Sequence, residues 1–138
     1  MKVNELRVGN FVRYNGANLP VYSISSPLPD KNKAFDNKER VVLSCDGLIY
    51  ATIENVEPIP LTKEFFEKNG FIKQHDWEEV LYYRSEDMRI DVYENYLGWV
   101  VNIDDDVFTI VFSNNLKHVH ELQNAYYIST GEELEIKL

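Results

Sequence analysis

The first sixty residues contain short, largely apolar stretches that are separated by turn residues. This pattern predicts strands at residues 11–14, 21–24, 40–45 and 48–53. The strongest local signal is Asp46-Gly47 between the last two, because both residues tolerate the positive φ angles of a two-residue type I′ turn. Short strands at this density, without a helical period, favour a small β-barrel of the SH3-like kind.

The second half of the chain begins with a helix and continues with strands. Thr62 is a suitable N-cap residue, and Gly70 can end the helix that begins after it. Strand candidates follow at residues 77–84, 88–94, 99–103 and 107–112. Their connections are short enough for an antiparallel meander.

A second helix and a final strand complete the predicted elements. An apolar stripe at helical spacing predicts a helix over residues 116–129 that ends at Gly131. Residues 134–138 then predict an edge strand, because charged residues alternate with apolar ones there. The order of elements predicts an α+β fold, in which an N-terminal small β-barrel (SH3-like) precedes an antiparallel sheet with two helices.

Charge divides the chain into two parts. The 138 residues include 14 basic and 23 acidic ones, for a net charge of −9. Residues 1–61 hold seven of each sign, so the whole net charge falls on residues 62–138. Two prolines interrupt regular structure in the segment Val56–Leu61 between them. We expect a β-barrel-like subdomain over 1–61 and an acidic α+β subdomain over 62–138, with a turn inside one domain as the alternative.

Composition narrows the class of protein. Hydrophobic residues make up 44% of the chain, which is enough for an ordinary packed core. No apolar run approaches the roughly 18 residues of a membrane span, and the opening MKVNELRVGN lacks the apolar stretch of a signal peptide. The lone Cys45 excludes an internal disulfide framework and a cysteine-based zinc site. We expect a cytoplasmic protein that has no cofactor and does not associate with a membrane.

Histidines and aspartates raise the question of a metal site. His118 and His120 would share a face on a strand, but on a helix they point about 200° apart. The run Asp104-Asp105-Asp106 lacks the alternating ligands and glycine of a calcium loop and is typical of a hairpin tip. The sequence therefore predicts no metal site.

Motifs for catalysis are missing from the sequence. The six glycines are scattered singly, so there is no phosphate-binding loop or dinucleotide fingerprint, and no serine lies in a nucleophile elbow. We assign no catalytic residue. A small hydrolase that uses His120 with nearby acids stays an alternative, and it requires a cleft in which His120 lies within about 3 Å of a carboxylate or hydroxyl.

Candidate binding residues come from both parts. Tyr14, Tyr22 and Tyr50 could line a peptide-binding groove of a small barrel, although core packing and a weak single-strand platform are alternatives. On the second helix, His120 and Gln123 lie in or beside the apolar stripe. A buried glutamine without partners costs roughly 1–3 kcal/mol, so Gln123 is expected to bond to sheet backbone or to a partner molecule.

The charge distribution favours a protein partner. A surface for duplex nucleic acid needs clustered basic residues, and residues 62–138 have the opposite sign. An acidic sheet face would attract a basic partner or imitate the charge of DNA. We therefore predict a non-enzymatic protein-interaction module whose partner is another protein, with an acidic DNA mimic or inhibitor protein as an alternative. The oligomeric state is left open.

Three segments carry a resemblance: Glu5–Asn10, Ile53–Thr62, and Val119–Tyr127 with Thr130–Leu134. In order and spacing they resemble an uncharacterised family of small proteins from gut anaerobic bacteria and their prophages or other mobile elements. The last segment is the most specific. The resemblance implies a bacterial cytoplasmic setting and a prophage-related accessory role. It implies no activity and no site residues.

Overall fold

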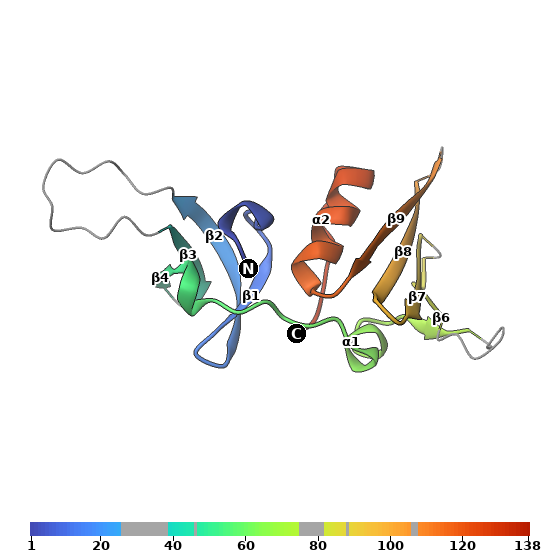
Figure 1. Cartoon of the computed structure of the whole chain (residues 1–138), viewed down its shortest axis with the longest axis horizontal. Coiled ribbons are helices and arrows are strands. Elements are labelled where there is room, and N and C mark those ends of the chain that lie inside the picture. Colours follow the sequence, from blue (N-terminus) through green and yellow to red (C-terminus); the bar gives the residue numbers. More distant parts are fainter. Residues whose placement is uncertain (26–38, 46, 75–81, 88, 106–107) are drawn as a thin grey trace, which may run out of the picture. The chain divides into compact units, whose positions relative to one another are not determined.

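The computed structural model describes residues 1–25, 39–45, 47–74, 82–87, 89–105 and 108–138. Its contacts divide the chain into two compact units, Met1–Ile59 and Pro60–Leu138, and each unit contains one antiparallel sheet (Figure 1). The division falls inside the segment Val56–Leu61, where prolines interrupt regular structure. With two antiparallel sheets and two helices, the fold is α+β as predicted.

The N-terminal unit, Met1–Ile59, is built on a four-stranded meander. Its elements are η1 (Val3–Glu5), β1 (Phe11–Tyr14), β2 (Ala17–Ser25), β3 (Arg40–Cys45), β4 (Gly47–Thr52) and η2 (Ile53–Asn55). Asn15 and Gly16 make the turn between β1 and β2 with positive φ angles of 49° and 82°. The four predicted strands are confirmed, whereas the predicted Asp46-Gly47 turn depends on Asp46, which lies outside the described residues.

The described residues of this unit form no closed barrel. The strand order is β1-β2-β3-β4, without a pair between β1 and β4. The other edge of β1 forms an isolated bridge with Glu57, in which the backbone N–H of each of Arg13 and Glu57 donates to the carbonyl of the other at 2.9 Å. The coarser expectation of a short-stranded antiparallel sheet holds, and the SH3-like barrel stays a prediction.

One face of the N-terminal sheet supplies the core of the unit. Val41 and Leu43 alternate with Val42 on β3, so the first two side chains point into the core and Val42 points to the other face. Burying a leucine completely, as for Leu43, contributes about 2–3 kcal/mol. The buried cluster consists of Leu6, Val12, Leu19, Val21, Val41, Leu43, Ala51 and Val56.

The C-terminal unit, Pro60–Leu138, is a five-stranded meander with two helices. Its elements are α1 (Lys63–Lys68), β5 (Ile72–Lys73), β6 (Tyr82–Arg84), β7 (Ile90–Asn95), β8 (Gly98–Asp105), β9 (Phe108–Leu116) and α2 (Val119–Thr130). The strands pair in sequence order, which confirms the predicted meander. Strand β5 was not predicted, because two residues are too few to show the alternation of apolar and polar residues that is typical of a strand. Most of the predicted strand 77–84 lies outside the described residues.

Helix α1 begins as its sequence predicts. The Oγ1 of Thr62 accepts a hydrogen bond from the backbone N–H of Phe65 at 3.2 Å, and Gly70 follows the helix with φ +77°. The helix places Phe66, which is fully buried, in the centre of an aromatic cluster. Its ring centroid lies 5.2 Å from Phe71, 5.8 Å from Tyr83 and 4.6 Å from Trp99. Such contacts between rings stabilise the fold in addition to the stabilisation that comes from burying their apolar area.

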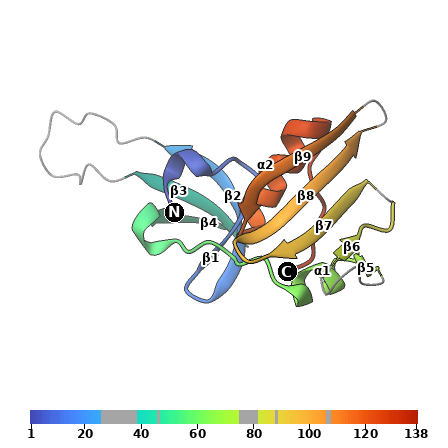
Figure 2. The ribbon, with the colours of Figure 1, turned by 45° about the vertical axis from the view of Figure 1, so that its right-hand side comes forward.

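Helix α2 packs against β8 and β9 (Figure 2). It begins at Val119, later than predicted, because β9 continues through Leu116 and His118 keeps an extended backbone as the N-cap. It ends at Gly131, whose N–H donates to the carbonyl of Tyr127 at 2.8 Å. Neither helix of the described chain combines the length and the apolar content that a membrane crossing needs.

The predicted edge strand at residues 134–138 is wrong. This segment has no regular secondary structure. The side chain of Asn69 binds it instead: its Oδ1 accepts from the N–H of Lys137 at 2.6 Å, and its Nδ2 donates to the carbonyl of Lys137 at 3.1 Å. One side-chain amide supplies the donor and the acceptor that a neighbouring strand would otherwise provide.

A tight turn joins β7 to β8. The Oδ1 of Asn95 accepts from the N–H groups of Leu97 and Gly98 at 2.8 and 3.0 Å. A Cβ atom at Gly98 would lie 2.8 Å from the carbonyl oxygen of Asn115, so β8 approaches β9 more closely than any other residue would allow. The turn leaves Tyr96 93% exposed.

Candidate functional site

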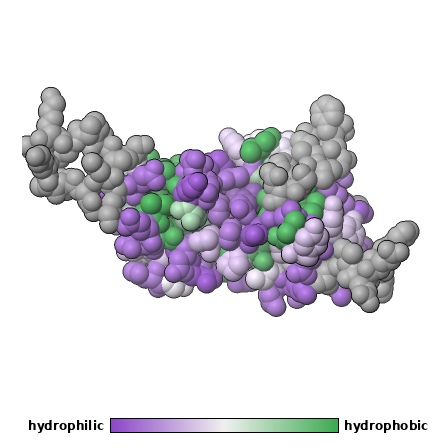
Figure 3. Space-filling model, viewed as in Figure 1, coloured by the Kyte–Doolittle hydropathy of each residue, from purple (hydrophilic) through white to green (hydrophobic). Residues whose placement is uncertain are grey.

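The second face of the N-terminal sheet carries exposed aromatic and aliphatic side chains. Tyr22 on β2 is 58% exposed, and Leu48 and Tyr50 on β4 are 50% and 70% exposed. Leu48 and Tyr50 alternate with Ala51 and Ile49, which pack on the core side. We call Tyr22, Leu48 and Tyr50 the tyrosine face. Figure 3 shows hydrophobic residues at the surface of the region that carries β3 and β4.

Strand β2 has a β-bulge at Tyr22. Val21 pairs with Leu43 and Ser23 pairs with Val42, so Tyr22 is an extra residue that β3 does not match. Val42 also pairs with Tyr50 on its other side. Tyr22 and Tyr50 therefore flank β3 at roughly twice the strand spacing, about 10 Å. Val42 between them is only 7% exposed.

Tyr14 does not belong to the tyrosine face. It is partly buried and packs against the core cluster of the N-terminal unit. The predicted trio is therefore divided, with Tyr14 on the core side and Tyr22 and Tyr50 on the outward side. The bulge in β2 changes the alternation only after Tyr22, so that Ile24 and not Ser23 packs on the core side.

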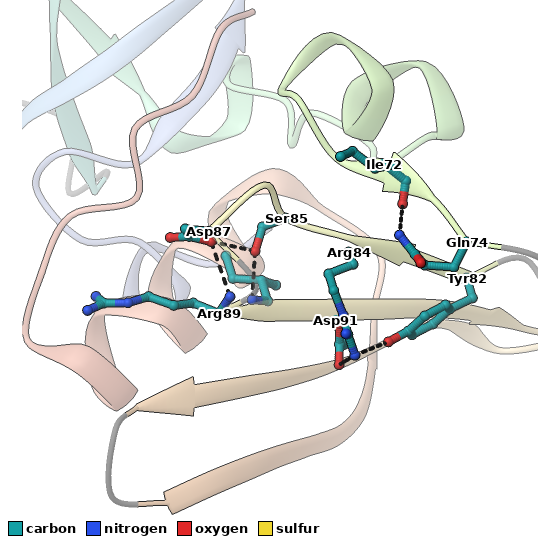
Figure 4. A network of polar contacts seen from close by, with 9 residues as sticks. Ile72, Gln74, Tyr82, Arg84, Ser85, Asp87, Arg89 and Asp91 are labelled. Atoms are coloured by element: carbon teal, nitrogen blue, oxygen red, sulfur yellow. Dashed lines mark hydrogen bonds and ion pairs between the residues drawn. The ribbon is translucent and has the colours of Figure 1, made fainter.

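The outward face of the C-terminal sheet is polar. Asp91 on β7 lies opposite Arg84 on β6, and its two carboxylate oxygens accept from Nε at 2.7 Å and Nη2 at 3.0 Å (Figure 4). The Nη2 of Arg84 also donates to the hydroxyl of Tyr82 at 2.8 Å. Asp91 and Tyr82 raise the pKa of Arg84 above its ordinary value. Burial, followed by Asp91, raises the pKa of Tyr82.

Basic side chains compensate part of the acidic charge of the C-terminal unit. Arg84 neutralises Asp91, and Arg89 forms an ion pair with Glu132 at 3.7 Å. Asp87 is engaged within its own turn, where its Oδ1 accepts from the Ser85 hydroxyl at 2.7 Å and from the N–H of Arg89 at 3.1 Å (Figure 4). A DNA mimic needs carboxylates that repeat along one face and keep their charge. The Arg84–Asp91 pair does not favour that alternative.

Three potential metal ligands lie together at the start of α2. One ligand atom from each of His118, His120 and Glu121 lies within 4.8 Å of the others. The helical argument that separated the histidines is wrong here, because His118 has extended backbone angles (φ −132°, ψ 153°) and only His120 is helical. The two imidazole rings stack with centroids 5.6 Å apart and an interplanar angle of 10°.

In the structure, Glu121 caps the N-terminus of α2. The Oε2 of Glu121 accepts from the backbone N–H groups of Lys117 at 2.7 Å and His118 at 2.9 Å. Each nitrogen lone pair lies in the plane of its own ring, and two stacked, nearly parallel planes do not meet close to both rings, so a shared metal ion would require one imidazole to rotate. Burial raises the pKa of Glu121, but the hydrogen bonds from Lys117 and His118 and the nearby imidazole outweigh it, and the net shift is downward.

His120 and Gln123 are both buried, with 2% and 1% of their surface exposed. The hydrolase alternative requires His120 in a cleft that a substrate can enter. Burial of its imidazole removes that access. Both residues belong to the buried side of α2, together with Val119 and Leu122.

The aspartate run lies at the end of β8. Asp104 is exposed and pairs with Thr109 of β9. Asp106, the last residue of the run, lies outside the described residues. Sequence patterns also missed Leu48 as a surface residue. The outward position of Tyr50 two residues later on the same strand is the signal that could have identified it.

Comparisons with protein-family models, with curated proteins and with solved structures give no match. The resemblance to a family from gut anaerobes and their prophages therefore stays a prediction. The candidate site is defined by the geometry of the chain itself.

Proposed function

We propose that the protein is a non-enzymatic interaction module and that its tyrosine face binds a segment of another protein. The observation that carries this proposal is the exposure of Tyr22, Leu48 and Tyr50 on one side of a small sheet whose opposite side forms the core. Tyrosine contributes a large, rigid contact area together with a hydroxyl that can form hydrogen bonds, and it is enriched among the residues that dominate binding energy.

The shape of the N-terminal unit supports an SH3-like barrel as the frame of this face. The bulge in β2 bends the strand, so that its first half pairs with β1 and its second half with β3. After β4 and η2 the chain returns to the free edge of β1 through Glu57. A bent strand and a returning chain are the means by which a short antiparallel sheet curls toward a barrel.

The charge of the unit is compatible with a protein segment as ligand. Residues 1–61 carry no net charge, so neither a basic nor an acidic segment meets long-range repulsion there. The three side chains of the tyrosine face are themselves uncharged. Recognition would therefore depend on apolar contact, and on hydrogen bonds to the tyrosine hydroxyls.

Selection of a displayed library of random peptides on the full chain tests the proposal. We expect the selected peptides to bind the wild type and to lose at least about tenfold in affinity for the variant Tyr22→Ser/Tyr50→Ser, because buried tyrosines at interfaces often contribute more than 1.4 kcal/mol. Isothermal titration calorimetry with a selected peptide provides the affinity.

The matched control is Tyr96→Ser, which removes an equally polar aromatic residue that is 93% exposed on the C-terminal unit. We expect it to bind as the wild type does. A library that yields no binder, or binders that do not distinguish the tyrosine-face variant from the wild type, would contradict the proposal.

A further inference from the structure

Strand β4 (Gly47–Thr52) lies at the edge of the N-terminal sheet. It pairs with β3 on one side and is the last strand in the order β1-β2-β3-β4. An edge strand presents unpaired backbone N–H and C=O groups along its free side, and these groups can pair with another strand.

The residues of β4 themselves include none of the usual protection against strand pairing. The six residues Gly-Leu-Ile-Tyr-Ala-Thr include no charged residue and no proline. By contrast, the short strand β5 at the edge of the other sheet carries Lys73. Natural sheets commonly place lysine, proline or a bulge on an edge, because a long uncharged edge invites association.

The charge distribution decides where two copies of the chain can approach. The net charge of −9 falls entirely on residues 62–138, and residues 1–61 are neutral. Two copies that met through the acidic part would repel one another, whereas two copies that met at β4 would bring together uncharged strands.

We infer that β4 pairs in an antiparallel manner with β4 of a second copy and that the protein forms a weak homodimer. The pairing is isologous, since the same strand contributes to both sides of a two-fold axis. Two strands of six residues bury less than the roughly 1,200 Å² of a stable interface, so the dimer forms only as concentration rises.

Strand alternation restricts the register of this pair. Residues that lie opposite each other share a face, so an outward residue must meet another outward residue. A two-fold axis at Ile49 satisfies this condition and places Leu48 of each copy opposite Tyr50 of the other. Aromatic–aliphatic cross-strand pairs of this kind stabilise sheets.

The dimer would double the tyrosine face. A two-fold axis perpendicular to a continuous sheet keeps both outward faces on the same side. Tyr22, Leu48 and Tyr50 of the two copies would then form one surface with two equivalent binding regions. A partner with two suitable segments would gain affinity from binding both.

Sedimentation equilibrium over a range of protein concentrations tests the pairing. We expect the apparent mass of the wild type to rise from 16.2 kDa toward twice that value, and Tyr50→Lys to stay at the monomer mass because it places a charge on the edge. Tyr96→Lys, which adds the same charge to an exposed residue of the other unit, is the control and should associate as the wild type does.

A mixing experiment tests the register. Leu48→Glu and Tyr50→Lys should each be monomeric alone, and their mixture should form a heterodimer in which the introduced carboxylate of one variant faces the introduced ammonium group of the other. Circular dichroism would verify that both variants are folded. A wild type that stays at 16.2 kDa at every concentration, a Tyr50→Lys variant that associates normally, or a mixture that stays monomeric would overturn the inference.

The experiments can reject the dimer without rejecting the proposed function, and the reverse. A monomeric wild type that still binds selected peptides through the tyrosine face removes only the strand pairing. A dimeric wild type for which no peptide can be selected removes only the proposed function.

Discussion

The two sheets of this protein bury one face each, but they differ in what they show to solvent. The outward face of the C-terminal sheet is polar, and the carboxylate of Asp91 is held by Arg84 at 2.7 and 3.0 Å. The outward face of the N-terminal sheet carries Tyr22, Leu48 and Tyr50, each at least half exposed. On the first face an arginine side chain pairs with a carboxylate, whereas the second face leaves apolar surface in water.

This difference indicates that one face contributes to the stability of the fold and that the other is available for binding. An exposed side chain contributes to stability only through the part of its surface that it buries. The tyrosine face therefore adds little to the free energy of unfolding, and its apolar area is available to a partner. The Arg84–Asp91 pair, by contrast, contributes to the fold of its own sheet. The following substitutions test this separation.

Leu122→Ala should have the largest effect. Leu122 is fully buried on the side of α2 that packs on the C-terminal sheet. The substitution leaves a cavity and should lower the free energy of unfolding by about 2–5 kcal/mol. Urea denaturation measures this loss. A loss below about 1 kcal/mol would show that the covered face is not packed as described.

Asp91→Asn should have an intermediate effect. The substitution keeps the shape of the side chain but removes the charge that pairs with Arg84, and we expect a loss of about 1–2 kcal/mol because Arg84 is partly exposed and its charge is screened. Glu94→Gln is the control. The ion pair between Glu94 and Lys63 is longer, at 3.5 Å, and both side chains are exposed. Equal losses for the two variants in denaturant unfolding would contradict the special role of the Arg84–Asp91 pair.

Glu121→Gln should have a smaller and pH-dependent effect. The folded state lowers the pKa of Glu121, so its charge stabilises the protein above the ordinary glutamate pKa of about 4.3, and this contribution is lost as the pH falls through the folded pKa. At neutral pH we expect a loss of up to about 1 kcal/mol. Melting temperatures of the two proteins should converge in acid. A difference that is constant with pH would contradict the capping role.

Tyr50→Ser should have the smallest effect on stability. The side chain is 70% exposed, so the free energy of unfolding should change by no more than about 0.5 kcal/mol. Thermal unfolding of this variant beside the wild type measures the change. A loss comparable to that of Asp91→Asn would show that the tyrosine face belongs to the core of the unit.

Much of the fold could be predicted from local patterns. A short stretch bounded by a turn identified β1 at Phe11–Tyr14, and period-two alternation identified β7 around Ile90. The capping residues Thr62 and Gly131 marked ends of helices, because their side chain or conformation is adapted to that position. These signals are carried by neighbours in sequence, which is why they need no knowledge of the tertiary structure.

The features that depend on distant residues could not be predicted. The last segment forms no strand, and its backbone at Lys137 is bound by Asn69, which lies 68 residues earlier in the chain. The Arg84–Asp91 pair requires the register of β6 and β7. The histidine cluster requires the three-residue delay of α2 that follows from the length of β9. Each depends on pairing or packing between elements, and no periodicity in the sequence encodes it.

The unmatched residue in β2 has a consequence for insertions and deletions. Removing one residue from a regular strand reverses every side chain beyond it, so buried positions become solvent positions. Removing Tyr22 would instead join Val21, opposite Leu43, directly to Ser23, opposite Val42, and both flanking ladders would keep their orientation. At this position β2 can be shortened by one residue without an exchange of its buried and exposed side chains.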